Sequence, residues 1–161
     1  MIVYHGSTSI IKTPDVNHSK RFLDLGQGFY VTSYRKQAER WARRKSLRNG
    51  NRPILNSFEM ETCDLEKFSF LNLHDNLSAW LDFVCACRKG GSDYCKYDVI
   101  SGPVADDDVF KTVDMFFRGL WDKEKTLSEL RFSEPNDQYC FVSQEALTTI
   151  LSFKDYKALD V

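Results

Sequence analysis

Short segments with strand character alternate irregularly with helical segments along this chain, and this order restricts the fold more than any other feature. Apolar, β-branched or alternating runs predict strands over residues 2–5, 29–32, 54–61, 68–71, 97–100 and 138–142. Apolar residues at three-to-four spacing predict helices over residues 33–47, 75–88, 106–117, 126–131 and 144–150. A regular strand-helix-strand rhythm and a phosphate-binding loop are both missing, so the order predicts an α+β fold and not a doubly wound sheet.

Local signals give the expected ends of several segments. Gly6-Ser7 is expected to form a turn after the first strand, and Ser33 is expected to cap the first helix. Asn49-Gly50 is expected to end that helix. Asp75 or Asn76 is expected to cap the next one.

Length and composition favour one compact domain over residues 1–161. Hydrophobic residues make up 42% of the chain, which is enough for a core. The apolar run at 83–87 is far shorter than the ~20 residues that cross a bilayer, and the first residues lack the basic region of an export signal. The five cysteines are an odd number that fits a reducing compartment. We therefore expect a cytoplasmic protein without membrane contact.

Two clusters bear on metal binding, and neither predicts a metal site. Cys85, Cys87 and Cys95 lack the usual spacing of paired zinc ligands. The carboxylates at 106–108 are adjacent at a helix start and so point in different directions, and carboxylates stabilise that end of a helix. We expect no metal.

Basic residues are concentrated in and just after the first helix, although the net charge is only −1. The stretch contains Arg35, Lys36, Arg40, Arg43, Arg44, Lys45, Arg48 and Arg52. Such a stretch is typical of a solvated helix face, of a site for a phosphate-rich ligand, or of a nucleic-acid contact, and the sequence leaves these alternatives open. It bears on function only if it borders a site.

The Gly26-Gln27-Gly28 segment is not a dinucleotide-binding loop. Such a loop follows a strand, opens a helix and carries a third glycine, whereas this segment leads into the strand at 29–32. Taken singly, His5, Tyr30, Trp41 and Gln138 are also most simply explained as packed or surface residues. Only their combination carries a functional signal.

Together these residues resemble the poly(ADP-ribose) polymerase-like, or diphtheria-toxin-type, branch of the ADP-ribosyltransferases. That branch has a His-Gly-Ser strand end, a Gly-x-Gly segment followed by an aromatic or aliphatic residue and Tyr, and an acidic residue opening a late strand. The matching segments here are His5-Gly6-Ser7, Gly26-Gln27-Gly28-Phe29-Tyr30 and Asp137-Gln138-Tyr139-Cys140-Phe141. Over nearly its full length the chain is also similar to the bacterial Domain of Unknown Function 3990, with residues 97–107 as a further characteristic stretch.

The resemblance implies an ADP-ribosyltransferase-like split β-sandwich of two small antiparallel sheets with flanking helices, and NAD as co-substrate. It assigns catalytic roles to His5, Tyr30 and Gln138. It places against NAD the residues Gly6, Ser7, Gly28, Tyr30 and Trp41. In this arrangement His5 binds ribose hydroxyls, Gly6 offers backbone groups to the nicotinamide amide, and Tyr30 and Trp41 enclose the nicotinamide ring.

Gln138 departs from the commonest pattern of that branch, which has Glu at this position. An amide can hydrogen-bond a ribose, but it cannot offset a developing positive charge or deprotonate an acceptor. Losing such a charge raises a barrier by roughly 2–4 kcal/mol. Glu134 and Asp137, just before Gln138, are our candidates for supplying the missing carboxylate.

The resemblance therefore implies a mono-ADP-ribosyltransferase with a protein or nucleic-acid acceptor. It also implies the toxin of a toxin and antitoxin pair or of a phage-defence pair, with an antitoxin protein as partner. Three alternatives stay open: a module that binds NAD or ADP-ribose without transfer, an NAD glycohydrolase, and an interaction domain that uses the basic stretch.

Overall fold

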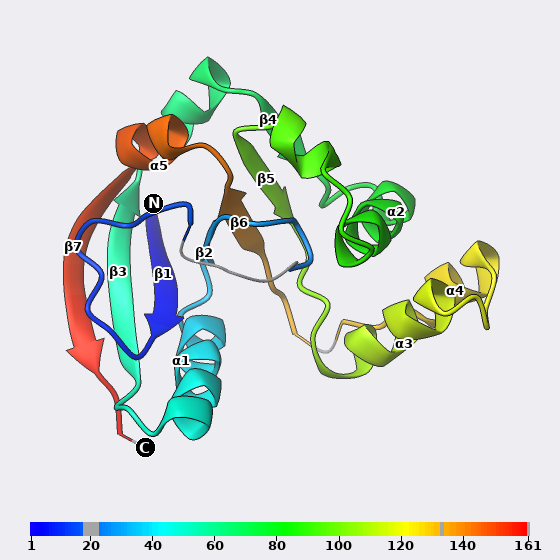
Figure 1. Cartoon of the computed structure of the whole chain (residues 1–161), viewed down its shortest axis with the longest axis horizontal. Helices are drawn as coiled ribbons and strands as arrows, with labels where there is room; N and C mark the ends of the chain where they lie inside the picture. The colour runs from blue at the N-terminus through cyan, green and yellow to red at the C-terminus, as the bar shows by residue number, and fades with distance from the viewer. Residues whose placement is uncertain (18–22, 133, 161) are drawn as a thin grey trace.

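The computed structural model describes residues 1–17, 23–132 and 134–160, which form two small sheets with helices around them (Figure 1). The first sheet, in the order β1-β3-β7, consists of β1 (Ile2–Ser7), β3 (Ile54–Met60) and β7 (Leu151–Ala158). The second, in the order β2-β6-β5-β4, consists of β2 (Phe29–Val31), β6 (Gln138–Phe141), β5 (Val99–Gly102) and β4 (Phe70–Asn72). The prediction of an α+β fold is confirmed.

Two features of the sheets differ from expectation. Strand β4 pairs with β5 in parallel, so the second sheet is mixed and not wholly antiparallel. Strand β7 was not predicted, because it follows helix α5 (Gln144–Ile150) without a turn and alternates only weakly. Strand β7 is an edge strand that pairs with β3 alone in this sheet, and most of its residues are exposed.

Four further helices complete the described structure, together with the 3₁₀ helices η1 (Thr62–Lys67) and η2 (Asp93–Lys96). They are α1 (Arg35–Asn49), α2 (Leu77–Arg88), α3 (Asp107–Phe117) and α4 (Lys123–Glu129). In Figure 1, α2, α3 and α4 gather beyond the second sheet, whereas α1 lies below β1 and β2. Helix α4 begins earlier than the predicted residue 126, because the Asp122 carboxylate caps it by accepting from the Lys125 amide.

Two of the expected element ends are wrong and two are confirmed. Gly6-Ser7 is not a turn, because β1 continues through both residues opposite β3. Ser33 does not cap α1: Tyr34 is the N-cap residue, and the Ser33 hydroxyl donates to the Asp137 carboxylate. Gly50 does end α1 in the left-handed conformation, and the Asn76 side chain does cap α2.

The core fills both faces of the second sheet and the space beside α1. Between the two sheets lie Val3, Phe29, Phe58 and Phe141, together with apolar residues of α5. The other face of the second sheet, which includes Tyr30, Ile100 and Cys140, packs against α2 and α3. A smaller cluster joins α1 to the first sheet through Ala38, Ala42 and Leu55. Helix α1 is thus fixed close to the ends of β1 and β2.

Gly6 permits the close approach of α1 to β1. A Cβ atom at Gly6 would lie 2.0 Å from the Ala38 carbonyl oxygen and 2.7 Å from the Ala42 nitrogen. These are backbone atoms inside a helix, so they cannot move aside without shifting it. The missing side chain of Gly6 therefore serves helix packing.

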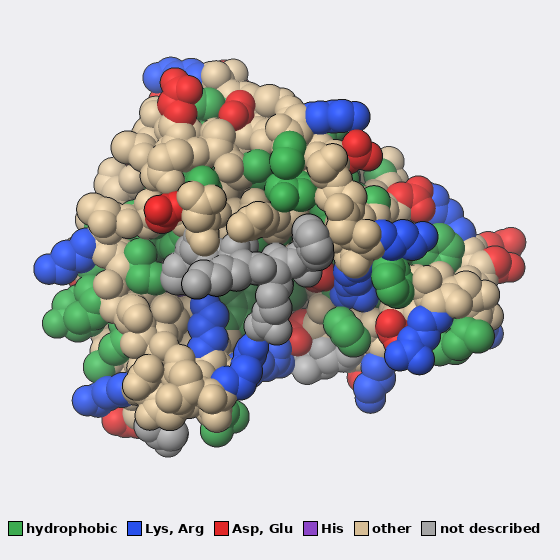
Figure 2. Space-filling view, viewed as in Figure 1, with side chains coloured by type: hydrophobic (Ala, Val, Ile, Leu, Met, Phe, Trp, Pro, Cys, Tyr) green, Lys and Arg blue, Asp and Glu red, His purple; other side chains and the backbone are tan. Residues whose placement is uncertain are grey.

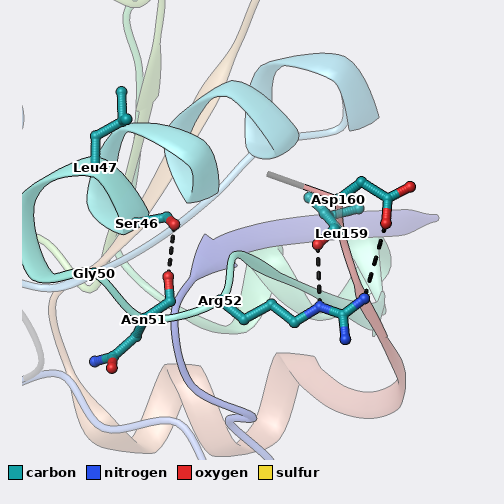
Figure 3. A pocket seen from close by; sticks show the side chains of 7 residues that line it. All are labelled: Ser46, Leu47, Gly50, Asn51, Arg52, Leu159 and Asp160. Carbon is teal, nitrogen blue, oxygen red and sulfur yellow. Dashed lines mark hydrogen bonds and ion pairs between the residues drawn. The ribbon is translucent and has the colours of Figure 1, made fainter.

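A hollow of about 410 Å³ lies at the C-terminal end of α1 (Figure 3). There the Ser46 hydroxyl donates to the Asn51 carbonyl at 2.6 Å, and Arg52 Nε donates to the Leu159 carbonyl at 3.2 Å. These bonds tie the end of α1 to the end of β7. The predicted site residues do not line this hollow.

In the part of the chain that the structure describes, no helix combines the length and the apolar character needed to cross a membrane.

Candidate functional site

A cavity of about 500 Å³ gathers residues from distant parts of the chain. Its lining consists of His5, Leu23, Asp24, Gly28, Tyr30, Trp41, Arg44, Lys45, Arg48, Val104, Ala105, Asp106, Phe110 and Gln138. They come from β1, the segment before β2, β2, α1, the segment before α3, α3 and β6. The predicted residues among them are His5, Gly28, Tyr30, Trp41 and Gln138. The volume lies in the range of small-molecule sites, roughly 300–1,000 Å³.

Gly6 and Ser7, predicted to contact NAD, are not among the lining residues. The carbonyl of Gly6 accepts a hydrogen bond from Lys45 Nζ at 2.9 Å, so Gly6 is connected to the cavity through a lining side chain. Ser7 is buried, and its hydroxyl accepts from the Ser9 amide at 3.4 Å. Their direct contact with a ligand stays a prediction.

His5 is held in one orientation at the end of β1. Its Nδ1 lies 2.6 Å from the Tyr30 carbonyl oxygen, and its ring stacks on Phe29 with centroids 4.3 Å apart. A carbonyl only accepts hydrogen bonds, so Nδ1 carries the hydrogen. In the neutral ring Nε2 is then the acceptor atom, and it is buried, so a hydroxyl donor such as a ribose must displace neighbouring groups to reach it.

Tyr30 shapes the loop in front of it as well as lining the cavity. Its hydroxyl donates to the Gly26 carbonyl at 2.5 Å and accepts from the Leu25 amide at 3.1 Å. Gly26 has φ +92°, and a Cβ atom there would lie 2.2 Å from the Tyr94 ring. Only glycine fits that backbone and that contact. Burial raises the pKa of Tyr30 well above its ordinary value, so its hydroxyl stays neutral at physiological pH.

Gln138 is 4% exposed at the start of β6, and its amide is oriented by a backbone carbonyl. Its Nε2 donates to the Pro103 carbonyl at 3.0 Å, and Trp80 Nε1 donates to the same oxygen at 3.0 Å. Oε1 is the acceptor atom of Gln138, and the bond from Nε2 to Pro103 fixes the orientation in which it can accept from a ligand. A Glu carboxylate here would face the Pro103 carbonyl without a hydrogen to share unless it were protonated.

Neither Glu134 nor Asp137 lines this cavity, so the hypothesis that one of them supplies a carboxylate to the site gains no support from the lining and stays a prediction. The Asp137 carboxylate accepts from the Thr32 hydroxyl and the Ser33 amide, both at 2.8 Å, which joins the start of β6 to the residues after β2. Glu134 is 66% exposed and lies 3.4 Å from Arg40.

The carboxylates that do line the cavity are Asp24 and Asp106, which the sequence analysis did not select. Asp24 lies 3.1 Å from the Arg88 guanidinium and accepts from the Ala105 amide at 3.3 Å. Burial raises the pKa of Asp24, and the charge of Arg88 opposes that shift. Asp106 lies 2.8 Å from Arg44. The sequence offered no reason to select these two carboxylates, because Asp24 belongs to no recognisable motif and a helix start was a sufficient explanation for Asp106.

One face of α1 brings positive charge to the cavity. Trp41, Arg44, Lys45 and Arg48 line the cavity and follow the i, i+3, i+4, i+7 spacing of a single helix face. The basic stretch therefore does border the site, through these three cations. Burial, and then the charge of Arg48, lower the pKa of Lys45 to about 8.

Comparison with known proteins places the chain in a family. The family model described as Protein of unknown function (DUF3990) matches residues 1–153. No curated protein and no solved structure matches the chain. A match over nearly all of the 161 residues is decisive for membership. The chain therefore belongs to the DUF3990 family.

Proposed function

We propose that this protein binds NAD in the cavity described above and transfers one ADP-ribose unit to a macromolecular acceptor. The observation that carries the proposal is the convergence of His5, Tyr30, Trp41 and Gln138 on one cavity of about 500 Å³. These residues come from four elements, β1, β2, α1 and β6, and all of them belong to the pattern in which the chain resembles ADP-ribosyltransferases.

The lining suits the two halves of a nicotinamide riboside unit. Tyr30 and Trp41 both line the cavity, and aromatic rings are suitable partners for the flat, cationic nicotinamide ring. The acceptor atoms of His5 and Gln138 suit ribose hydroxyls, and both side chains are held by backbone carbonyls. Such preorganised polar groups favour a transition state whose charge spreads over the ribose.

The reaction breaks the bond between C1′ of the ribose and N1 of nicotinamide. The electron pair of that bond goes to N1, which neutralises the ring, and the ribose takes on oxocarbenium character. The acceptor atom then bonds to C1′ and loses its proton to a base or to water. Gln138 cannot act as that base, which favours transfer of a single unit over chain elongation.

The negative charge near the ribose comes from Asp24 in this proposal. Asp24 and Asp106 are the carboxylates in the lining, and Asp24 directly precedes the residues that bind the Tyr30 hydroxyl. We expect Asp24→Asn to slow nicotinamide release by about tenfold or more, the scale of losing one electrostatic contact. Glu134→Gln, an exposed carboxylate outside this cavity, is the matched control and should keep the normal rate.

The test of the proposal is incubation of the purified protein with adenine-labelled NAD and a bacterial lysate, with or without nuclease or protease. Free nicotinamide and macromolecule-bound label are followed together. Tyr30→Ala removes an aromatic wall of the cavity, whereas Tyr156→Ala removes an exposed tyrosine from β7. We expect bound label with the wild type and Tyr156→Ala, and none with Tyr30→Ala.

The other outcomes identify the alternatives. Nicotinamide release without bound label would indicate an NAD glycohydrolase, with water as the acceptor at C1′. NAD binding without release would indicate a binding module in which Gln138 has replaced the acid. Absence of NAD binding would refute all three.

The same variants test the proposed toxin role. Expression of the wild type in bacteria should arrest growth, and Tyr30→Ala should relieve the arrest. Growth that is equally slow with both variants would argue against a toxin that acts through this cavity.

A further inference from the structure

Lys45 and Arg48 are two cations in the cavity wall that form no ion pair with any carboxylate whose side chain is described. Of the three basic side chains that α1 places there, Arg44 lies 2.8 Å from Asp106. Lys45 Nζ donates to a neutral group, the Gly6 carbonyl. Among the side chains that the structure describes, which leave out that of Asp107, no carboxylate forms an ion pair with Lys45 or Arg48, and Asp24 is already engaged by Arg88.

Holding these cations in the cavity wall costs free energy. Lys45 is partly buried, and moving an ammonium group out of water costs free energy that a neutral carbonyl offsets only in part. Arg48 adds a second positive charge about one helical turn away. Burial of Lys45, and then the charge of Arg48, lower the pKa of Lys45 to about 8. An anionic ligand would offset both effects.

The chemistry of the two side chains selects the kind of anion. Arg presents a planar fork that binds phosphate oxygens bidentately, and Lys adds a compact point charge. They are three residues apart, about one turn along one face of α1, so they can contact adjacent phosphates of one group. Figure 2 shows Lys and Arg side chains gathered over the part of the view where α1 lies.

We propose that Lys45 and Arg48 form a subsite for the diphosphate group of a nucleotide, on the α1 wall of the cavity. For NAD as the nucleotide the inference rests on the proposed function, while the subsite itself requires only a diphosphate. In this proposal the phosphates are bound by cations along the side of α1. The glycine segment before β2 is therefore not needed as a phosphate-binding loop.

The experiment measures calorimetric affinities for four probes: inorganic pyrophosphate, ADP, NAD and nicotinamide riboside, which lacks the diphosphate. Lys45→Met and Arg48→Met each remove one cation while keeping a flexible side chain. Lys36→Met is the matched control, because Lys36 is exposed on the same helix and does not line the cavity. Lys45→Arg preserves the charge.

We expect Lys45→Met and Arg48→Met to weaken pyrophosphate, ADP and NAD by about tenfold or more, and to leave nicotinamide riboside within about twofold. Lys36→Met should change every affinity by less than about twofold, and Lys45→Arg should retain most of the affinity. Circular dichroism and thermal unfolding of each variant show that it is folded.

The failure of this subsite and the failure of the proposed function give different results. Pyrophosphate and ADP binding that depends on Lys45, without any binding of nicotinamide riboside or cleavage of NAD, would support the subsite and refute the NAD reaction. Equal weakening of NAD and nicotinamide riboside by Lys45→Met would overturn the subsite. So would absent pyrophosphate and ADP binding by the wild type.

A nucleic-acid surface is the remaining outcome. If a short oligonucleotide bound more tightly than ADP and lost as much affinity with Lys36→Met as with Lys45→Met, the whole basic face of α1 would be the contact, and the diphosphate subsite would be refuted.

Discussion

The ammonium group of Lys45 lies 2.9 Å from a neutral carbonyl in the wall of the cavity, and its pKa is lowered to about 8 from an ordinary 10.5. The folded protein therefore binds this proton less tightly than the unfolded chain does. The cost to stability is fully present below pH 8 and disappears above pH 10.5, so the contribution of this group to stability rises with pH between these values.

Lys45→Met should consequently stabilise the free protein. We expect its unfolding free energy to rise at pH 7, by an upper limit of about 3 kcal/mol, and the gain to vanish near pH 10.5. Urea unfolding at both pH values measures this difference. A loss of stability at pH 7 would mean that the hydrogen bond to Gly6 outweighs the cost of burying the charge.

The hydroxyl and the ring of Tyr30 have separable tasks. Tyr30→Phe leaves the buried Leu25 amide and Gly26 carbonyl without their partner, which should cost about 1–3 kcal/mol. The ring remains in the cavity, so NAD affinity should fall much less than in Tyr30→Ala. Denaturant unfolding and calorimetry together check this. Equal losses of affinity in the two folded variants would show that the loop, and not the ring, determines binding.

Gln138→Glu tests the contact with Pro103. The variant loses the donor to that carbonyl, so its carboxyl should favour the protonated form, with a folded pKa above the unfolded value of roughly 4.3. Stability should match the wild type at acid pH and fall as pH rises through that window, by about 1–3 kcal/mol at pH 7. Unfolding at pH 4 and pH 7 measures it, and a loss independent of pH would contradict the assignment.

At the scale of elements, the position of α1 decides whether the cavity has its basic wall. Gly6→Ala would place a Cβ atom 2.0 Å from the Ala38 carbonyl oxygen, so the helix must shift. We expect a destabilisation above about 2 kcal/mol and a loss of NAD binding. Gly50→Ala is the control: its Cβ meets no atom within 4 Å, and its positive φ of 74° should cost only about 1 kcal/mol.

Thermal unfolding of the two variants distinguishes packing from backbone strain. If Gly6→Ala were as mild as Gly50→Ala, α1 would tolerate displacement from β1, and the close contact would not define the site.

At the scale of the whole molecule, the Asp24 and Arg88 pair joins the cavity to the layer of helices beyond the second sheet. Arg88 lies at the end of α2, 4.6 Å from the centre of the Phe110 ring of α3, so its side chain connects α2 both with α3 and with the segment before β2. Both partners of the pair are less than one-fifth exposed.

Arg88→Met leaves the Asp24 carboxylate buried without its cation. We expect a loss of about 3–5 kcal/mol at pH 7, because a broken buried pair leaves an uncompensated charge. The pKa of Asp24 is already raised, and it rises further without Arg88, so the loss should be small below pH 3.8 and grow as pH increases. Urea unfolding between pH 3.8 and pH 7 measures this trend. The control is the double variant Arg88→Met, Asp24→Asn, which lacks the buried carboxylate. A loss without pH dependence would point to packing alone.

Local patterns in the sequence were sufficient for most elements, whereas the candidate site residues were selected by the resemblance to ADP-ribosyltransferases. The strand that carries His5, the strand after Gly28 and the helix that carries Trp41 could be predicted, because periodicity and glycines are local signals. Strand β7 could not, since its exposed edge position leaves little alternation. The parallel pairing of β4 with β5 depends on contacts between distant segments, which periodicity does not encode.

By itself the sequence determined the α+β class and selected His5, Tyr30, Trp41 and Gln138. Only the tertiary structure decided which charges meet them. Asp24 and Asp106 line the cavity while Glu134 and Asp137, next to Gln138 in the chain, do not, and α1 turns Lys45 inward but Lys36 outward. The physical reason is that the position of a charge depends on how elements pack, and α1 packs where Gly6 lets a helix backbone approach a strand.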